Sequence, residues 1–272
     1  RRRRGRAYVG RGYLSQRADL RPNVGTFAAT IEVDGERASE MTSPHVRTDE
    51  TLVNLHAQDR VSSDMVVLIP VKSFATAKAR LGPVLGPDER AALARGMAAR
   101  VIEAAAPAAV WVVCDDEEVA GFARLHRADV CWTPGLGLNG ALAEALSRAE
   151  RAGASQTVIA HADLPFAADL PSLVRPGRAV LVPDRHRDGT NVMCLPTSVG
   201  FRPAYGPRSY ARHRAEARRL GLGVDSIDVP TLAWDVDRSD DLWPPQELGA
   251  WPPELPRPTA TPTPTPTPEV RP

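Results

Sequence analysis

The chain has 272 residues, and its 34 basic and 33 acidic side chains give a formal net charge of +1. This near balance is unlike that of a protein that binds polyanions over its whole surface, and no apolar run reaches the roughly 20 residues that a membrane-spanning helix needs. The cysteines Cys114, Cys131 and Cys194 lie apart in apolar stretches, which favours reduced core cysteines and a cytoplasmic location over a disulfide framework.

Composition divides the chain into three parts. Residues 1–64 mix Arg, Gly, Ser, Thr and Asp without a sustained period, which predicts a poorly ordered N-terminal extension, with Met65 as a candidate start of the native protein. Residues 65–243 carry the regular patterns of one folded domain. Residues 244–272 are rich in proline and close with a Thr-Pro repeat at 259–268, which predicts a disordered tail.

Within residues 65–243, short apolar runs alternate with amphipathic stretches. In chain order, strands are predicted at residues 65–71, 109–114, 157–160, 179–183, 191–195 and 224–229. Helices are predicted at residues 88–105, 117–127, 139–152 and 209–220. This alternation predicts a single-domain α/β fold, an αβα sandwich with a mostly parallel sheet, in which ligands gather at the carboxyl ends of the strands.

The only two lysines of the chain, Lys72 and Lys78, follow the first predicted strand, and Arg80 lies beside them. A lysine ammonium is a compact point charge, whereas the arginine guanidinium that this chain uses elsewhere is a wide planar fork. A narrow gap between phosphate oxygens suits the ammonium, so the pattern favours a polyphosphate clamp. The alternative is a pair of solvated surface charges. The loop has neither a Walker A nor a GxGxxG pattern.

Two acidic loops are candidate metal sites. Asp163 ends an apolar run before a Leu-Pro pair, and its carboxylate suits Mg²⁺, which takes one or two carboxylates together with phosphate oxygens and water. The alternative for Asp163 is a turn before proline. In the segment 234–242, Asp235 and Asp237 are expected on the same side of an extended chain because side chains alternate. A solvated acidic turn is the alternative there.

Three further loops carry small and polar residues. Residues 133–140 include Gly137 and Asn139 ahead of a predicted helix, where backbone N–H groups are free for an anion. Residues 184–191 and 205–213 offer amide, hydroxyl and guanidinium donors suited to a small phosphorylated carboxylate, namely Thr190, Asn191, Gly206, Ser209 and Arg212. Taken singly, each loop is equally well explained by turns and helix caps.

Taken in chain order, six segments form a recognisable series. They are residues 70–81 with their Pro-Val-Lys opening, residues 137–142, the Asp-Leu-Pro at 163–165, and residues 184–191, 205–213 and 235–242. The series resembles the CofC/FbiD guanylyltransferases over residues 65–242. The resemblance implies a nucleotidyltransferase fold related to GT-A glycosyltransferases, with a central mixed sheet. One departure is the pair Arg187 and Asp188, where a smaller, glycine-like stretch is expected.

The resemblance also implies a reaction. GMP moves from GTP to the phosphate of phosphoenolpyruvate or 2-phospho-L-lactate with release of pyrophosphate, a step in coenzyme F-420 biosynthesis that uses Mg²⁺ and feeds a downstream F-420 pathway transferase. The implied triphosphate ligands are Lys72, Lys78 and Arg80. The implied metal ligands are Asp163 and Asp235, with Asp237 as the alternate. Gly137 and Asn139 are expected near the nucleoside, and Thr190, Asn191, Gly206, Ser209 and Arg212 near the acceptor.

Three alternative functions are weighed against this one. A molybdenum-cofactor-type or sugar-phosphate nucleotidyltransferase usually opens with a glycine-rich loop after the first strand, and Pro-Val-Lys replaces it here. A nucleic-acid-binding protein could use the arginines of residues 1–6 and 212–219, but the near-neutral charge and the lack of a reader motif count against it. A catalytically inactive scaffold is disfavoured by the retention of Lys72, Lys78, Asp163 and Asp235.

Overall fold

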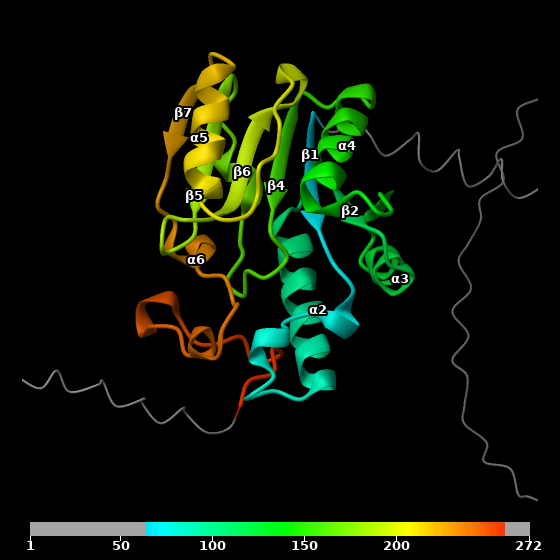
Figure 1. Ribbon diagram of the computed structural model, residues 1–272, viewed down its shortest axis with the longest axis vertical. Helices are drawn as coiled ribbons and strands as arrows, with labels where there is room; N and C mark the ends of the chain where they lie inside the picture. Colours follow the sequence, from blue (N-terminus) through cyan, green and yellow to red (C-terminus); the bar gives the residue numbers. More distant parts are fainter. Residues whose placement is uncertain (1–63, 259–272) are drawn as a thin grey trace, which may run out of the picture. The chain divides into compact units, whose positions relative to one another are not determined.

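The computed structural model describes residues 64–258 of the chain (Figure 1). The disorder predicted for residues 1–63 and for residues 259–272, including the Thr-Pro repeat, concerns parts of the chain that lie outside the described residues.

A seven-stranded sheet is the centre of the described domain, with the strand order β3-β2-β1-β4-β6-β5-β7. The strands span Met65–Pro70 (β1), Ala109–Cys114 (β2), Asp129–Trp132 (β3), Gln156–Ala160 (β4), Arg178–Pro183 (β5), Thr190–Pro196 (β6) and Gly223–Ser226 (β7). β6 runs antiparallel to β4 and β5, and the other neighbouring pairs are parallel. The predicted mostly parallel, mixed sheet is therefore confirmed.

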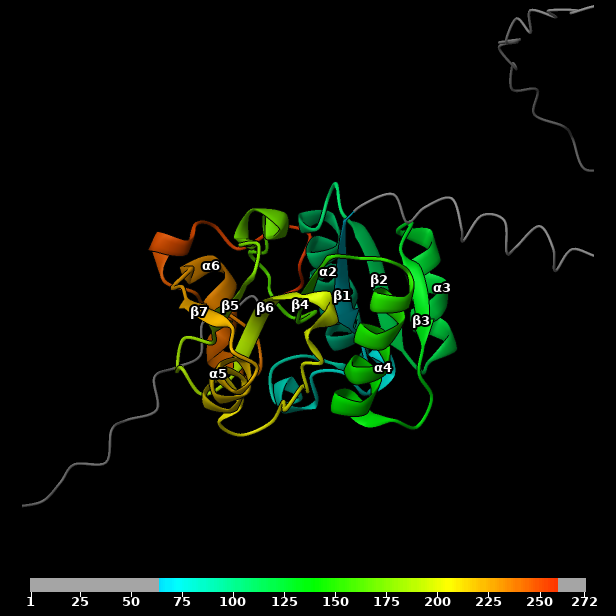
Figure 2. The same ribbon diagram turned by 90° about the horizontal axis from the view of Figure 1, so that it is seen from above.

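Helices cover both faces of this sheet (Figure 2). They span Pro87–Ala104 (α2), Glu117–Leu125 (α3), Gly137–Arg151 (α4), Ser209–Arg219 (α5) and Pro230–Ala233 (α6). Short 3₁₀ turns span Phe74–Thr76 (η1), Ala79–Leu81 (η2), Leu170–Leu173 (η3), Thr197–Val199 (η4), Ser239–Leu242 (η5) and Gln246–Leu248 (η6). Residues of α2, α3 and α6 pack in one apolar cluster and residues of α4 and α5 in another, which confirms the αβα sandwich. No helix among the described residues is long and apolar enough to cross a bilayer.

The sequence of β1 explains why two clusters form. Val67 and Ile69 belong to the cluster under α2, whereas Val66 and Leu68 belong to the cluster under α4, and all four are fully buried. Successive side chains of a strand point to opposite faces. A continuous apolar run is therefore what a central strand covered on both faces requires.

The predicted elements agree with the structure to within about three residues at their ends. The strand predicted at residues 109–114 has the observed bounds of β2, whereas the strand predicted at 224–229 ends early, at Ser226. β3 was not predicted. It has only four residues and pairs with β2 alone, so its sequence carries too few alternating positions to register as a strand.

The prediction of a disordered tail from residue 244 onward is wrong for residues 244–258. Gln246–Leu248 forms the turn η6, and Leu255 is 4% exposed in an apolar cluster with residues of α2. Trp243 and Trp251 are partly buried against the same cluster. These large side chains supply apolar surface that the proline-rich composition obscured.

Because β6 runs antiparallel, its first residues lie at the carboxyl edge of the parallel strands, and two of them are predicted site residues. Thr190 and Asn191 open β6, and Val192 pairs with Ala160 near the end of β4. His161 N donates to Asn191 O at 3.0 Å just beyond that pair. The start of β6 therefore lies beside the carboxyl end of β4, next to Asp163.

Candidate active site

The lysine loop leaves β1 at the carboxyl edge of the sheet. It begins with a hydrogen bond from Val71 N to Val113 O (3.0 Å) and buries Phe74 in η1. Lys78 then adopts a left-handed backbone (φ 53°, ψ 38°) before η2, a conformation that costs a non-glycine residue on the order of 1 kcal/mol. Its side chain is 12% exposed, whereas that of Arg80 is 71% exposed. The loop thus places one cation inside the domain and one at its surface.

Lys78 contacts two of the three predicted metal ligands. Its Nζ lies 2.7 Å from Asp163 Oδ2 and 3.4 Å from Asp237 Oδ1. Arg80 Nη1 lies 3.6 Å from Asp237 Oδ2. Loops that follow β1, β4 and α6 therefore meet at Lys78.

Electrostatics keep Lys78 and Asp163 charged. Burial alone would lower the pKa of the Lys78 ammonium, but Asp163 and Asp237 outweigh it and leave that pKa above its ordinary value. Burial would raise the pKa of the Asp163 carboxyl, but Lys78 and His161 outweigh it and leave that pKa below its ordinary value. Burial lowers the pKa of His161, although Asp163 acts in the opposite direction, so the imidazole is neutral near pH 7.

Asp235 lies beside the start of β6. Its Oδ1 is 3.5 Å from Asn191 Nδ2 and 3.8 Å from a guanidinium nitrogen of Arg185. Burial, followed by repulsion from Asp163 and Asp237, raises the pKa of Asp235 to about 6. Val236 lies between Asp235 and Asp237 and is fully buried in an apolar cluster with residues of α2, whereas the two aspartates face the charged groups. The predicted alternation of this extended segment is consistent with that arrangement.

Two residues that the sequence did not single out hold the acidic segment in place. Asp241 is 3% exposed, and one of its oxygens accepts hydrogen bonds from the N–H groups of Asp237 and Arg238, both at 2.7 Å. Arg185 donates to the other oxygen of Asp241 and to the backbone carbonyl of Asp235 (3.1 Å). Both lie in segments that carried the family resemblance, Arg185 in residues 184–191 and Asp241 in residues 235–242, but neither was predicted as a site residue.

The carboxylates fit a divalent cation bound together with a phosphate ligand. Asp163 Oδ1 is buried without a hydrogen-bond partner, and burial followed by repulsion from neighbouring carboxylates raises the pKa of Asp235. Within residues 64–258, no three His, Cys, Asp or Glu side chains are arranged to hold a metal ion by themselves. This donor set suits Mg²⁺, which combines one or two carboxylates with phosphate oxygens and water.

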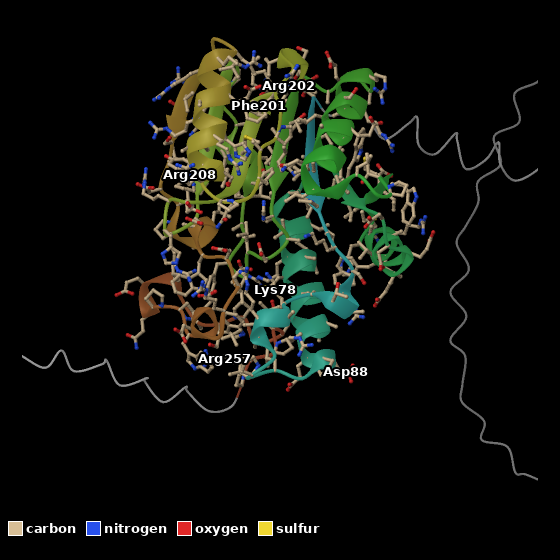
Figure 3. The ribbon with its side chains drawn as sticks, viewed as in Figure 1. Lys78, Asp88, Phe201, Arg202, Arg208 and Arg257 are labelled. Atoms are coloured by element: carbon tan, nitrogen blue, oxygen red, sulfur yellow. The ribbon has the colours of Figure 1, made fainter. Side chains whose placement is uncertain are left out.

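A cavity of about 470 Å³ lies at this cluster, within the usual size range of small-molecule sites. Its charged and polar lining comprises Lys72, Thr76, Lys78, Arg80, His161, Asp163 and Asp237, and its apolar lining includes Ala94, Met97 and Leu138. Figure 3 shows Lys78 beyond the ends of the strands and beside α2. The cavity therefore combines cationic and anionic side chains with an apolar wall from α2 and α4.

His213 organises the predicted acceptor residue Thr190. Ala204 N donates to His213 Nε2 at 3.0 Å, so the proton of the neutral ring is on Nδ1, which lies 3.0 Å from Thr190 Oγ1. Burial, followed by the charge of Arg212, lowers the pKa of His213 to about 4. Because Thr190 accepts from the imidazole, its own O–H remains able to donate to an anion.

The other predicted acceptor residues lie at the start of α5 or are used within the fold. Ser209 N donates to Gly206 O at 3.0 Å, and Gly206 has φ +116°, a conformation that favours glycine. The exposed Arg212 has a guanidinium nitrogen 3.4 Å from the position of a Cβ on Gly206. Asn191, by contrast, uses its amide to donate to Leu232 O at 3.0 Å.

The two residues predicted near the nucleoside, Gly137 and Asn139, differ in what they contact. Gly137 opens α4 with φ +61°, and its place beside the nucleoside stays a prediction. Asn139 Oδ1 accepts from Tyr205 N at 2.6 Å, and its Nδ2 donates to Tyr205 O at 3.2 Å. Its amide thus ties α4 to the loop before α5, a contact that the sequence did not predict. Leu136, rather than Asn139, precedes the helix as its cap.

The fold and this cluster of cations and carboxylates define an α/β protein of the nucleotidyltransferase type. A crystal structure from Desulfovibrio desulfuricans G20, assigned provisionally to the nucleotide-diphospho-sugar transferases, shares the fold with a TM-score of 0.55 and 22% identity over 66% of this chain and 85% of that chain. Residues 65–244 match the family described as "Guanylyl transferase CofC like", and the chain belongs to this family.

Curated relatives carry guanylyltransferase names. The phosphoenolpyruvate guanylyltransferase of Sphaerobacter thermophilus is 39% identical over 186 residues, which cover 65% of this chain and 90% of that protein. The 3-phospho-D-glycerate guanylyltransferase of Phenylobacterium zucineum is 34% identical over 187 residues, which cover 64% of this chain and 86% of that protein. The chain is therefore a guanylyltransferase, as its motifs indicated.

Proposed function

We propose that this guanylyltransferase binds GTP with Mg²⁺ and transfers GMP to the phosphate of phosphoenolpyruvate, releasing pyrophosphate. The observation that carries the proposal is the position of Lys78 between Asp163 and Asp237, in a cavity that Lys72 and Arg80 also line. A charged pocket of this kind suits a triphosphate and a metal ion together.

The chemistry requires alignment rather than proton transfer. An oxygen of the acceptor phosphate forms a bond to the α-phosphorus of GTP while the bond from that phosphorus to the pyrophosphate oxygen breaks. The acceptor phosphate is already an anion, so we assign no general base. Lys72, Lys78 and Arg80 hold the triphosphate and neutralise the charge that collects on the departing pyrophosphate.

The carboxylates have the metal-binding role in this proposal. Asp163 and Asp235 would hold Mg²⁺, with Asp237 as the alternate ligand, and the bound ion supplies positive charge to the reacting phosphates. The unpartnered Oδ1 of Asp163 supports this assignment. Lys78 keeps Asp163 ionised, since its charge opposes the effect of burial on the pKa of that carboxyl.

The acceptor side combines groups for a phosphate with a group for a carboxylate. Thr190, Gly206 and Ser209 would supply hydroxyl and N–H donors to the phosphate, and Arg212 would pair with the carboxylate. We place phosphoenolpyruvate first because the Sphaerobacter relative is named for it. The Phenylobacterium relative is named for 3-phospho-D-glycerate, so that acid is one alternative acceptor. The other is 2-phospho-L-lactate, which the family resemblance of the sequence implies.

We place the reaction in coenzyme F-420 biosynthesis in the cytoplasm, where GTP is available and where a downstream F-420 pathway transferase would consume the product. Family membership supports the pathway. The buried, unpaired Cys114, Cys131 and Cys194 suit a reducing compartment.

The proposal is tested by pyrophosphate release from GTP and Mg²⁺ with each of the three acceptors and with none. We expect release only with an acceptor, fastest with phosphoenolpyruvate, and a loss of about 100-fold or more in Asp163→Asn, since a charged group that acts on the transition state is removed. Asp225→Asn is the matched control, because Asp225 pairs with Arg178 at the far edge strand. Equal rates with and without acceptors, or an active Asp163→Asn, would contradict the proposal.

A further inference from the structure

The C-terminal segment 249–257, here called the strap, folds back against α2 (Figure 1). The family match ends at residue 244, so the strap lies outside the region that the chain shares with that family. Its conformation is closed by hydrogen bonds from Leu255 N to Pro252 O (3.0 Å) and from Trp251 Nε1 to Leu255 O (2.9 Å). An ion pair between Glu254 and Arg100 joins it to α2.

Leu255 occupies a socket on α2 that a glycine creates. A Cβ on Gly96 would lie 2.5 Å from Leu255 Cδ2, closer than real Cβ contacts allow. Leu255 is 4% exposed and belongs to one apolar cluster with Leu93 and Met97 of α2, which are both fully buried. The strap is therefore anchored by shape as well as by charge.

The same apolar cluster receives side chains from both charged loops of the active site. Leu81 and Leu85 follow Lys78 and Arg80 in the lysine loop, and both are at most 2% exposed. Val236 lies between Asp235 and Asp237 in the acidic segment, and it is fully buried in this cluster. Leu255 thus belongs to the same cluster as the buried side chains of both loops.

The strap also reaches the third loop. Phe166 lies three residues after Asp163, and its ring meets that of Trp251 edge to face, with centroids 6.2 Å apart. Every loop that contributes a charge to the Lys78 cluster therefore has an apolar residue against the strap or against the cluster that Leu255 completes.

We propose that the strap positions the Lys78 loop and the Asp235–Asp237 segment for catalysis, so that residues 249–257 belong to the working enzyme although they lie outside the family domain. The strap touches no reacting group and acts through Leu81 and Val236. The effect on turnover rests on the proposed guanylyl transfer. The effect on loop mobility does not depend on it.

The chain offers a site-selective probe of that mobility. Lys72 and Lys78 are its only lysines, so an endoproteinase specific for lysine can cut only in the loop that the strap is inferred to support. In the full-length protein, Leu255→Ala should raise the initial rate of this cleavage several-fold, because the loop opens more often. Leu255→Met, which keeps the volume, should restore the slow rate.

Leu146→Ala is the matched control. Leu146 is a buried leucine of α4, 7% exposed, in the cluster on the opposite face of the sheet. Its loss should lower thermal stability without accelerating cleavage, under conditions in which both variants remain folded. Equal acceleration in Leu255→Ala and Leu146→Ala, or none in either, would overturn the strap proposal.

Kinetics then separate positioning from stability. With phosphoenolpyruvate and Mg²⁺, Leu255→Ala should lower kcat/KM for GTP by about 10- to 100-fold, since a displacement of about 1 Å of a catalytic group can cost that much. Leu146→Ala should leave it within about twofold of wild type. If wild type shows no guanylyl transfer, the proposed function fails while the cleavage result still judges the strap. If wild type is active and Leu255→Ala retains full kcat/KM, the strap has no positioning role.

Discussion

Lys78 shows how much of this site depends on the identity of single residues. Its ammonium reaches Asp163 at 2.7 Å from a left-handed backbone position and is only 12% exposed. The sequence argument that a compact cation suits this loop is therefore stronger for Lys78 than for Lys72, which is exposed. Asp163 raises the pKa of Lys78 and Lys78 lowers the pKa of Asp163, so each favours the charged form of the other.

Replacing Lys78 with arginine tests whether shape matters as well as charge. The planar guanidinium is wider than an ammonium and does not fit the same narrow position between two carboxylates. We expect Lys78→Arg to lose about 100-fold or more in kcat/KM for GTP while the circular dichroism spectrum and the melting temperature stay close to wild type. A rate near that of wild type would show that only the charge is needed.

At the scale of elements, strand direction decides which residues meet. The sequence predicted both Thr190 and Asp163 as site residues. The short connection from β5 to β6, residues 184–189, allows only an antiparallel neighbour, but no local pattern states that β6 also pairs with β4 and brings its first residues beside the end of that strand. This second pairing lies outside any short window of sequence. The same limit explains why Asp241 was missed, because its burial comes from contacts with Arg185 and the acidic segment.

α5 and β6 are joined by His213, and this junction predicts a pH dependence of stability. The pKa of His213 in the folded protein is about 4, below its ordinary value of about 6.5 in an unfolded chain. The stability that this residue contributes is therefore complete above pH 6.5 and is lost as the pH falls toward 4, by an amount on the order of 3 kcal/mol. Thr190 on β6, His161 beyond β4 and Arg212 on α5 face or surround the ring, and none of them favours its protonation.

The measurement is the free energy of unfolding in denaturant from pH 4 to pH 7.5 for wild type and His213→Gln. Other groups titrate equally in the two proteins, so the difference isolates His213. We expect the variant to be less stable at pH 7, because a buried hydrogen-bonded ring is lost, but to lose less stability below pH 6.5. Parallel curves for the two proteins would show that His213 accepts a proton as readily in the fold as outside it.

At the scale of the whole molecule, the described residues contain the family domain, residues 65–244, and a following segment whose Leu255 packs against α2 of that domain. The sequence predicted the αβα domain well, since its alternating apolar runs and amphipathic helices are local signals. It failed at residues 244–258, where proline content predicted disorder although Trp251 and Leu255 anchor the chain. Gly96 on α2 gave no usable signal either, because its role as a socket depends on a residue far along the chain.

The central claim, guanylyl transfer to phosphoenolpyruvate, is tested most directly by ³¹P NMR of GTP, Mg²⁺, phosphoenolpyruvate and the full-length protein. The account predicts that the resonance of the acceptor's phosphate monoester declines while free pyrophosphate accumulates and a coupled pair of diphosphate resonances appears. None of these changes should occur without the acceptor. Formation of GDP and inorganic phosphate, or of pyrophosphate in the absence of phosphoenolpyruvate, would contradict the account.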